Sequence, residues 1–170
     1  PSVLVGDFLY SRAFQMMVDV NNMRVMQVLS EATNVIAEGE VQQLVNMHDP
    51  SLDEQAYLRV IRSKTAKLFE ASARLAPILC GASKEIEQAC ATYGQALGTA
   101  FQVIDDLLDY EGNADELGKN LGDDLREGKV TLPVILAYRR GTAEERGFWR
   151  AAIEKGETSD ENLDKAFGFL

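Results

Sequence analysis

Residues 84–110, KEIEQACATYGQALGTAFQVIDDLLDY, decide the fold class of this chain. Within them, apolar residues recur every three or four positions at Leu97, Phe101, Ile104 and Leu108, so one face of an α-helix would carry all four. At ~1.5 Å per residue, such a helix would be roughly 40 Å long. A helix of that length suits a large helical bundle.

The same periodicity continues outward from this stretch. It predicts helices over about 3–19 and 23–46, with a break between them at Asn21-Asn22. Further helix starts are predicted by three capping boxes and by one proline in a first turn, namely Ser51 with Glu54, Thr142 with Glu145, Thr158 with Glu161, and Thr131 before Pro133. Pro77 is expected to kink or end the helix that begins near Ser51. Because no segment alternates like a strand, the sequence predicts an all-α fold in one domain.

Composition narrows the classes of function. The chain has 170 residues, of which 46% are apolar, and it should bury a core. Its net charge of −10 repels phosphate backbones, so we expect no nucleic acid partner. No apolar run approaches the ~20 residues needed to cross a bilayer, so no transmembrane segment is predicted. Only two cysteines are present, Cys80 and Cys90, and this favours a soluble, cytoplasmic protein without a disulfide framework.

Four polar residues near the end of the 84–110 stretch are candidates for chemistry. Gln102, Asp105, Asp106 and Asp109 are spaced so that they would share one helical face. Like charges at this spacing destabilise a helix. A divalent cation such as Mg²⁺ would offset the repulsion, because it takes oxygen ligands and is commonly held by one or two carboxylates together with substrate phosphates. The alternative interpretation is a solvated acidic face, which has weight in a chain this acidic.

Three lysines supply possible cationic partners. Lys64 precedes Thr65 on the third predicted helix, and Lys119 and Lys129 lie in a Gly-rich polar loop over 111–129, where small residues let a backbone fold around an anion. Each lysine taken singly is more often an exposed charge. Their joint placement near the carboxylates favours a metal-bridged anion. The only histidine, His48, lies beside Pro50 in a predicted loop, where we expect a surface role.

Several motifs, taken in order, resemble those of one protein family. They are Gly6 to Phe14 (GDFLYSRAF), Glu38-Gly39-Glu40 followed by Gln43-Leu44, Lys64-Thr65-Ala66, Phe101 to Asp109, Gly118-Lys119 and Gly128-Lys129. The whole chain resembles the trans-prenyl diphosphate synthases, the polyprenyl synthetase family. Stretches 5–17 and 35–44 are most similar to its bacterial long-chain members, the octaprenyl diphosphate synthases.

The resemblance implies an isoprenoid-synthase helical bundle in which two Asp-rich motifs face each other across a deep cavity. It implies that Asp105, Asp106 and Asp109 bind Mg²⁺. It also implies diphosphate contacts and catalytic roles for further residues. The implied diphosphate-binding residues are Lys64, Thr65, Gln102, Lys119 and Lys129, and the implied catalytic residues are Lys64, Thr65, Gln102, Asp105 and Lys119.

The implied activity is that of a Mg²⁺-dependent transferase. An allylic diphosphate ionises, the double bond of isopentenyl diphosphate attacks the cation, and a proton is lost, repeatedly, until a long all-trans polyprenyl diphosphate is made as a quinone side-chain precursor. Electrostatic and Lewis-acid stabilisation of the departing diphosphate would carry catalysis, without a protein nucleophile. Family members form dimers through helices that match about 3–44, so a homodimer is expected.

The sequence departs from the family pattern in one respect. The first Asp-rich motif and the basic residues that bind isopentenyl diphosphate should precede Gly6, and the final helices should follow Leu170. We therefore expect residues 1–170 to be the central part of one polyprenyl synthetase domain, truncated at both ends and inactive alone. Alternative interpretations are a non-catalytic regulatory or scaffold subunit of a prenyl synthase, a helical interaction domain, and a terpene cyclase.

Overall fold

The computed structural model describes residues 2–111, 121–156 and 158–170, and these residues form helices and no strand. This confirms the prediction of an all-α fold. The first two predicted helices are α1 (Ser2–Asp19) and α2 (Met23–Asn46), and the stretch quoted first is α5 (Lys84–Glu111). Within the described residues, none of the helices combines the length and the apolar character needed to span a membrane.

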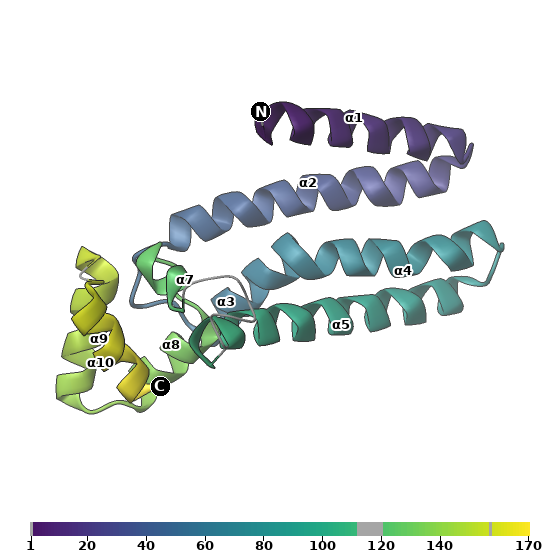
Figure 1. Ribbon diagram of the computed structural model, residues 1–170. Coiled ribbons are helices and arrows are strands. Elements are labelled where there is room, and N and C mark those ends of the chain that lie inside the picture. Colours follow the sequence, from purple (N-terminus) through teal and green to yellow (C-terminus); the bar gives the residue numbers. More distant parts are fainter. Residues whose placement is uncertain (1, 112–120, 157) are drawn as a thin grey trace.

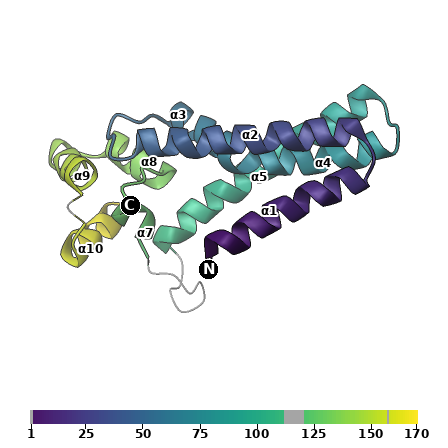
Figure 2. The ribbon, with the colours of Figure 1, turned by 90° about the horizontal axis from the view of Figure 1, so that it is seen from above.

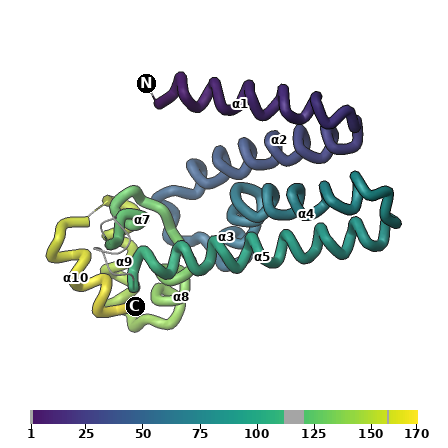
Figure 3. The backbone as a smooth tube through the Cα atoms, turned by 45° about the vertical axis from the view of Figure 1, so that its right-hand side comes forward, coloured from purple at the N-terminus to yellow at the C-terminus, as the bar shows by residue number. Residues whose placement is uncertain are grey.

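The long helices form one elongated bundle. Helix α4 (Lys67–Leu79) lies beside α5, α2 packs on α4, and α1 runs along the outer edge beside α2 (Figure 1 and Figure 3). Glycines allow the closest approach between α4 and α5, since a Cβ added at Gly94 would lie 2.5 Å from the carbonyl oxygen of Phe69. Many large apolar side chains of α1 are exposed, including Leu4 and Phe8.

The third predicted helix differs from its prediction. Helix α3 (Glu54–Ile61) is capped by Asp53, whose side chain accepts from the backbone N–H of Ala56, so the predicted Ser51–Glu54 capping box is wrong. Ser51 instead donates its backbone N–H and its hydroxyl to Asp49. A π-helical turn, η1 (Arg62–Ala66), separates α3 from α4, and α4 continues past Pro77 to Leu79.

A second group of helices sits at the end of the bundle where α2 and α5 finish (Figure 1 and Figure 2). It contains α7 (Asp123–Arg126), α8 (Leu132–Arg140), α9 (Ala143–Lys155) and α10 (Asp160–Phe169). Their shared core includes the fully buried Trp149, Ile153 and Val134. The group packs against α3 and the end of α5 through one contiguous apolar cluster.

The helix starts in this group test the remaining capping predictions. The predicted Thr142–Glu145 capping box is confirmed. The predicted Thr158–Glu161 box is wrong, because Ser159 caps α10 by accepting from the backbone N–H of Asn162. Thr131 occupies the N-cap position of α8 but makes no capping bond, since its buried hydroxyl donates to the hydroxyl of Tyr110.

His48 ties the end of α2 to the second group of helices. Its backbone N–H donates to the carbonyl of Gly128 at 2.9 Å, and its Nδ1 lies 2.9 Å from the carbonyl oxygen of Ile153, which requires the proton on Nδ1. Gly128 has φ of 83°, and a Cβ there would meet the His48 ring at 2.1 Å. Only glycine therefore fits this crossing. The role of His48 is structural, and it lies on the exposed side of the loop as predicted.

Candidate active site

A polar cavity of about 460 Å³ lies where the bundle meets α7. It is lined by residues of α2, η1, α5, α7 and the segment that leads into α8: Gln43, Lys64, Gln102, Asp105, Asp106, Leu108, Asp109, Leu121, Asp123, Asp124, Glu127, Lys129 and Thr131. The structure therefore brings most of the sequence-predicted site residues around one space. Thr65 is bonded to Gln102 beside it, whereas Lys119 lies outside the described residues.

The π-helical turn η1 presents the cationic side of the cavity. The Lys64 ammonium donates to Gln43 Oε1 at 2.7 Å and lies 3.4 Å from Glu40 Oε2. The backbone of η1 is held closely on two sides, because a Cβ at Gly39 of α2 would lie 2.6 Å from Lys64 N and one at Gly98 of α5 would lie 2.6 Å from Ala66 Cα. Such π-helical turns are frequent at functional sites. Here the turn is fixed by the two helices that it touches.

The carboxylates of α5 also line the cavity. Gln102 donates through Nε2 to Asp106 Oδ1 at 2.7 Å and to Asp105 Oδ2 at 3.1 Å. Asp105 is exposed, whereas Asp106 is only 5% exposed. Burial raises the pKa of Asp106, although its hydrogen bonds from Tyr57 and Gln102 act in the opposite direction. The predicted acidic stripe is thus divided between a solvent-facing and a buried carboxylate.

Asp109 joins α5 to the loop that carries α7. Its Oδ2 accepts from the backbone N–H of Asp124 at 3.2 Å, and its carbonyl accepts from the backbone N–H of Gly122, which has φ of 76°. Burial and the nearby charge of Asp124 raise the pKa of Asp109 to about 6. At neutral pH this carboxylate is therefore ionised but is easily protonated on mild acidification.

Lys129 is held by the same loop. Its ammonium donates to Asp124 Oδ1 at 2.9 Å and lies 2.7 Å from Glu127 Oε2. Burial opposes the charge of Lys129, but the hydrogen bonds that its ammonium donates to Glu127 and Asp124 outweigh this effect and raise its pKa. Lys129 is therefore a permanent cation at the edge of the cavity.

Several residues of this site were not identified by sequence reasoning, among them Tyr57 and Asp124. Tyr57 of α3 donates its hydroxyl to Asp106 Oδ2 at 2.6 Å, and Asp124 bridges Asp109 and Lys129. Tyr57 precedes Lys64 by seven residues, a spacing that would have placed both on one helical face. Asp124 lies in the short helix α7 and precedes Lys129 by five residues, a spacing that carries no comparable signal.

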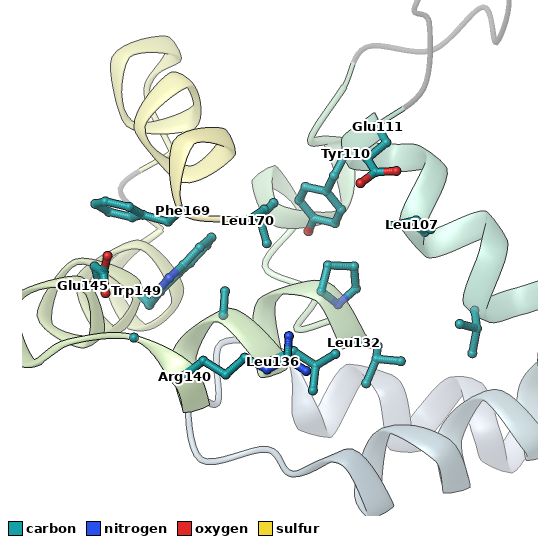
Figure 4. Close-up of a pocket in the computed structure, with 14 residues that line it drawn as sticks. Leu107, Tyr110, Glu111, Leu132, Leu136, Arg140, Glu145, Trp149, Phe169 and Leu170 are labelled. Atoms are coloured by element: carbon teal, nitrogen blue, oxygen red, sulfur yellow. The ribbon is translucent and has the colours of Figure 1, made fainter.

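A second cavity, of about 500 Å³, lies between the end of α5 and helices α8, α9 and α10 (Figure 4). Leu107 and Tyr110 of α5 face Leu132 and Leu136 of α8 across it, and Phe169 of α10 closes one side (Figure 4). It is mainly apolar and contains none of the sequence-predicted site residues. The polar cavity, although slightly smaller, is therefore the candidate active site.

The donors at the polar cavity suit a hard divalent cation. They are carboxylate and amide oxygens, which Mg²⁺ and Ca²⁺ prefer. Among the residues that the structure describes, no group of three or more His, Cys, Asp or Glu side chains is arranged to hold a metal ion by itself. Mg²⁺ commonly takes only one or two carboxylates and completes its shell with water and phosphate oxygens. Asp105 and Asp109 therefore fit a cation that binds together with a phosphate ligand.

In the metal-free protein, Asp109→Asn is expected to raise thermal stability near pH 7 and to flatten its pH dependence between about pH 4 and 6. The pKa of Asp109 is raised from 3.8 to about 6, so in this window the folded state retains a proton that the unfolded chain has lost. Stability thus falls as pH rises through the window. Because the side chain is only half buried, solvent screening limits the effect to about 1 kcal/mol.

Thermal unfolding of the natural polypeptide, followed by circular dichroism in EDTA from pH 4 to 8, measures this effect. Asp164→Asn, on the exposed surface of α10, is the matched control and should leave the curve unchanged. If the unfolding temperature of Asp109→Asn changed with pH in parallel with that of the wild type, the raised pKa of Asp109 would be contradicted.

The described residues form an all-α bundle in which carboxylates of one helix and two lysines line the same polar cavity, an arrangement suited to a divalent cation and a phosphate-bearing ligand. The sequence model of the polyprenyl synthetase family matches residues 1–170, and the chain belongs to this family.

Individual relatives support the same assignment. The chain is 57% identical over 155 residues to octaprenyl diphosphate synthase of Escherichia coli, with 91% of this chain and 48% of the relative covered. It is 52% identical over 165 residues to octaprenyl diphosphate synthase of Haemophilus influenzae, with 95% and 50% covered. The chain thus spans about half the length of the curated relatives it matches.

Solved structures agree with the fold. A polyprenyl synthase from Caulobacter crescentus, complexed with calcium and isoprenyl diphosphate, superimposes with a TM-score of 0.94 at 46% identity, covering 99% of this chain and 51% of that one. A decaprenyl diphosphate synthase from Rhodobacter capsulatus gives a TM-score of 0.89 at 52% identity, covering 99% and 52%. The fold of the described residues is therefore that of the isoprenoid-synthase helical bundle.

Proposed function

We propose that the natural protein containing this chain condenses isopentenyl diphosphate with an allylic diphosphate to make a long-chain all-trans polyprenyl diphosphate, a quinone side-chain precursor. The observation that carries the proposal is the convergence of Lys64 and Lys129 with the α5 carboxylates around one polar cavity. Relatives named octaprenyl diphosphate synthase support a long product and give no support to a non-catalytic subunit. Residues 1–170 would form the central part of the synthetase domain.

The residues around the cavity have distinct roles in this proposal. Asp105 and Asp109 would hold Mg²⁺, which when bound supplies Lewis-acid stabilisation of diphosphate charge. Lys64 and Lys129 attract the allylic diphosphate and stabilise the negative charge that builds on it as it departs. Lys119 carries the same predicted role, from a loop position outside the described residues.

Polar neighbours of the lysines orient the substrate. Gln102 and Thr65 are bonded to each other beside Lys64, where their oxygen atoms would accept hydrogen bonds from the water molecules that surround the diphosphate. Asp106, which the sequence also predicts as a metal ligand, is buried behind Asp105 and accepts from two donors. These contacts favour a supporting role for its carboxylate.

The direct test is an assay of the purified natural polypeptide with labelled isopentenyl diphosphate and, separately, dimethylallyl, geranyl and farnesyl diphosphate as primers. We expect Mg²⁺-dependent incorporation that stops when EDTA is in excess and resumes when Mg²⁺ is restored. The chain length of the products, resolved by reversed-phase chromatography, tests the long-chain assignment. Failure to incorporate label with every primer would exclude the proposed function.

A homodimer is part of the proposal. The exposed apolar side chains of α1, among them Leu4 at 73% and Phe8 at 67% exposure, would be covered by a second copy of the chain pairing through α1 and α2. Sedimentation velocity of the natural polypeptide at micromolar concentration should give a dimer. A stable monomer under these conditions would count against the pairing.

A further inference from the structure

We propose that Tyr57 is a positioning residue for the proposed transfer reaction, acting through Asp106 on Gln102 and through Gln102 on the hydroxyl of Thr65. The inference rests on the proposed function, because it concerns the wall against which the allylic diphosphate would bind. It assigns to α3 a part in the site that no motif of the sequence indicates.

The first link joins α3 to α5. Tyr57 is only 4% exposed and belongs to the apolar cluster beneath the cavity, so its ring has little freedom to move. Its hydroxyl donates to Asp106 Oδ2 at 2.6 Å. Such a short bond to a carboxylate, shielded from water, is among the stronger hydrogen bonds in proteins. Asp106 is thereby fixed by a residue from another helix.

The second link fixes the orientation of an amide. Asp106 Oδ1 accepts from Gln102 Nε2 at 2.7 Å, and Asp105 Oδ2 accepts from the same nitrogen at 3.1 Å. Ionised carboxylates only accept hydrogen bonds, so the NH₂ group of Gln102 must face α5 and its carbonyl oxygen must face the other way. The orientation of this amide follows from the chemistry of its neighbours.

The third link reaches the π-helical turn. With the Gln102 carbonyl turned toward η1, the Thr65 hydroxyl donates to Gln102 Oε1 at 2.8 Å. The hydroxyl hydrogen of Thr65 is then used in its bond to Gln102. The Thr65 oxygen can therefore only accept a further hydrogen bond, and it cannot donate one to a bound ligand. The chain Tyr57, Asp106, Gln102, Thr65 therefore sets which polar group is presented beside Lys64.

Tyr57→Phe removes the first donor and leaves the ring in place. The Asp106 carboxylate then keeps Gln102 as its remaining side-chain donor on α5 and can rotate in its pocket, and the amide and the Thr65 hydroxyl lose their fixed orientation. Misplacement of groups at a reacting centre lowers the rate of the chemical step more than it weakens binding. We expect kcat to fall by about 10- to 100-fold, while KM for the allylic diphosphate changes by less than about 3-fold.

The experiment compares the natural polypeptide with its Tyr57→Phe and Tyr138→Phe variants under saturating Mg²⁺, below the unfolding temperature of each. Tyr138 of α8 is the matched control, since its hydroxyl contacts only Arg150 at the exposed surface among the bonds described. Wild-type kcat in Tyr57→Phe would overturn the inference. So would a loss of rate that disappears after correction for the folded fraction, because this would mean that the hydroxyl acts on stability alone.

A double-mutant cycle tests the route of action. Asp106→Asn breaks the chain at the next link, because its amide has a single carbonyl oxygen and cannot accept from both Tyr57 and Gln102 as the carboxylate does. We expect Asp106→Asn to lower kcat at constant KM, as Tyr57→Phe does. In the Asp106→Asn background, we expect Tyr57→Phe to lower kcat further by less than about 2-fold. Fully multiplicative effects would overturn the inference. Should Tyr57→Phe not fold, Asp106→Asn alone still tests it through the split between kcat and KM.

These outcomes are separable from those of the proposed function. If the wild type incorporates no isopentenyl diphosphate, the proposed function itself fails. If the wild type is active and Tyr57→Phe matches Tyr138→Phe, only the positioning role of Tyr57 fails.

Discussion

Asp105→Asn in the natural polypeptide is expected to lower the rate of diphosphate release by about 10²- to 10³-fold while the helical content and unfolding temperature stay near those of the wild type. Asp105 is the exposed carboxylate of the α5 stripe, and it faces the cavity that also contains Lys64 and Lys129. The substitution retains shape but removes the negative charge that would hold a divalent cation against the departing diphosphate.

Release of diphosphate, measured with a coupled phosphate assay across a Mg²⁺ titration, provides the comparison. Asp164→Asn on the exposed face of α10 is the matched control and should behave as the wild type. Near-wild-type turnover of Asp105→Asn at low Mg²⁺ would refute the metal-binding role.

Gly39→Ala is expected to cost about 1–3 kcal/mol of stability and to lower turnover by about 100-fold. The new Cβ would lie 2.6 Å from Lys64 N and 3.0 Å from Lys64 Cα, which are backbone atoms of a turn that Gly98 holds from the other side. Neither neighbour can yield by a side-chain rotation. Helix α2 and η1 must therefore move apart, and Lys64 and Thr65 move with η1.

Urea unfolding and steady-state kinetics of the natural polypeptide measure the two effects. Gly147→Ala on α9 is the matched control, because a Cβ there meets nothing within 4 Å. The control should be neutral or more stable by about 0.5–1 kcal/mol, as expected for alanine in a helix interior. Wild-type stability and turnover in Gly39→Ala would contradict the close packing of α2 on η1.

The location of most helices could be predicted from local patterns. Periodicity placed α1, α2 and α5 within one or two residues of their observed bounds, because the apolar stripe of a helix is encoded by neighbours three and four positions apart. Capping residues were less reliable. Asp53 and Ser159, rather than Ser51 and Thr158, cap α3 and α10, since several acceptors compete within two positions of each helix start.

The π-helical turn shows where local patterns stop being informative. Residues 62–66 have no signal that distinguishes η1 from an α-helix, yet this turn carries both Lys64 and Thr65. The backbone of η1 is in close contact with Gly39 of α2 and Gly98 of α5, and both glycines lie far from η1 in the sequence. A conformation of this kind depends on packing between elements, which the sequence of one element does not encode.

The sequence by itself determined the helical architecture and the stripe of Gln102, Asp105, Asp106 and Asp109 on one face of α5, because both depend on spacing within a single segment. It also determined the family, because several short motifs follow one another along the chain in the family's order. Only the tertiary structure decided which of these carboxylates is buried and which residues of other elements donate hydrogen bonds to them. Tyr57 reaches Asp106 across 49 positions of chain, and Asp124 turns back onto Asp109 across 15. Contacts between elements follow from how their apolar faces pack together, and no periodicity within one helix specifies that geometry.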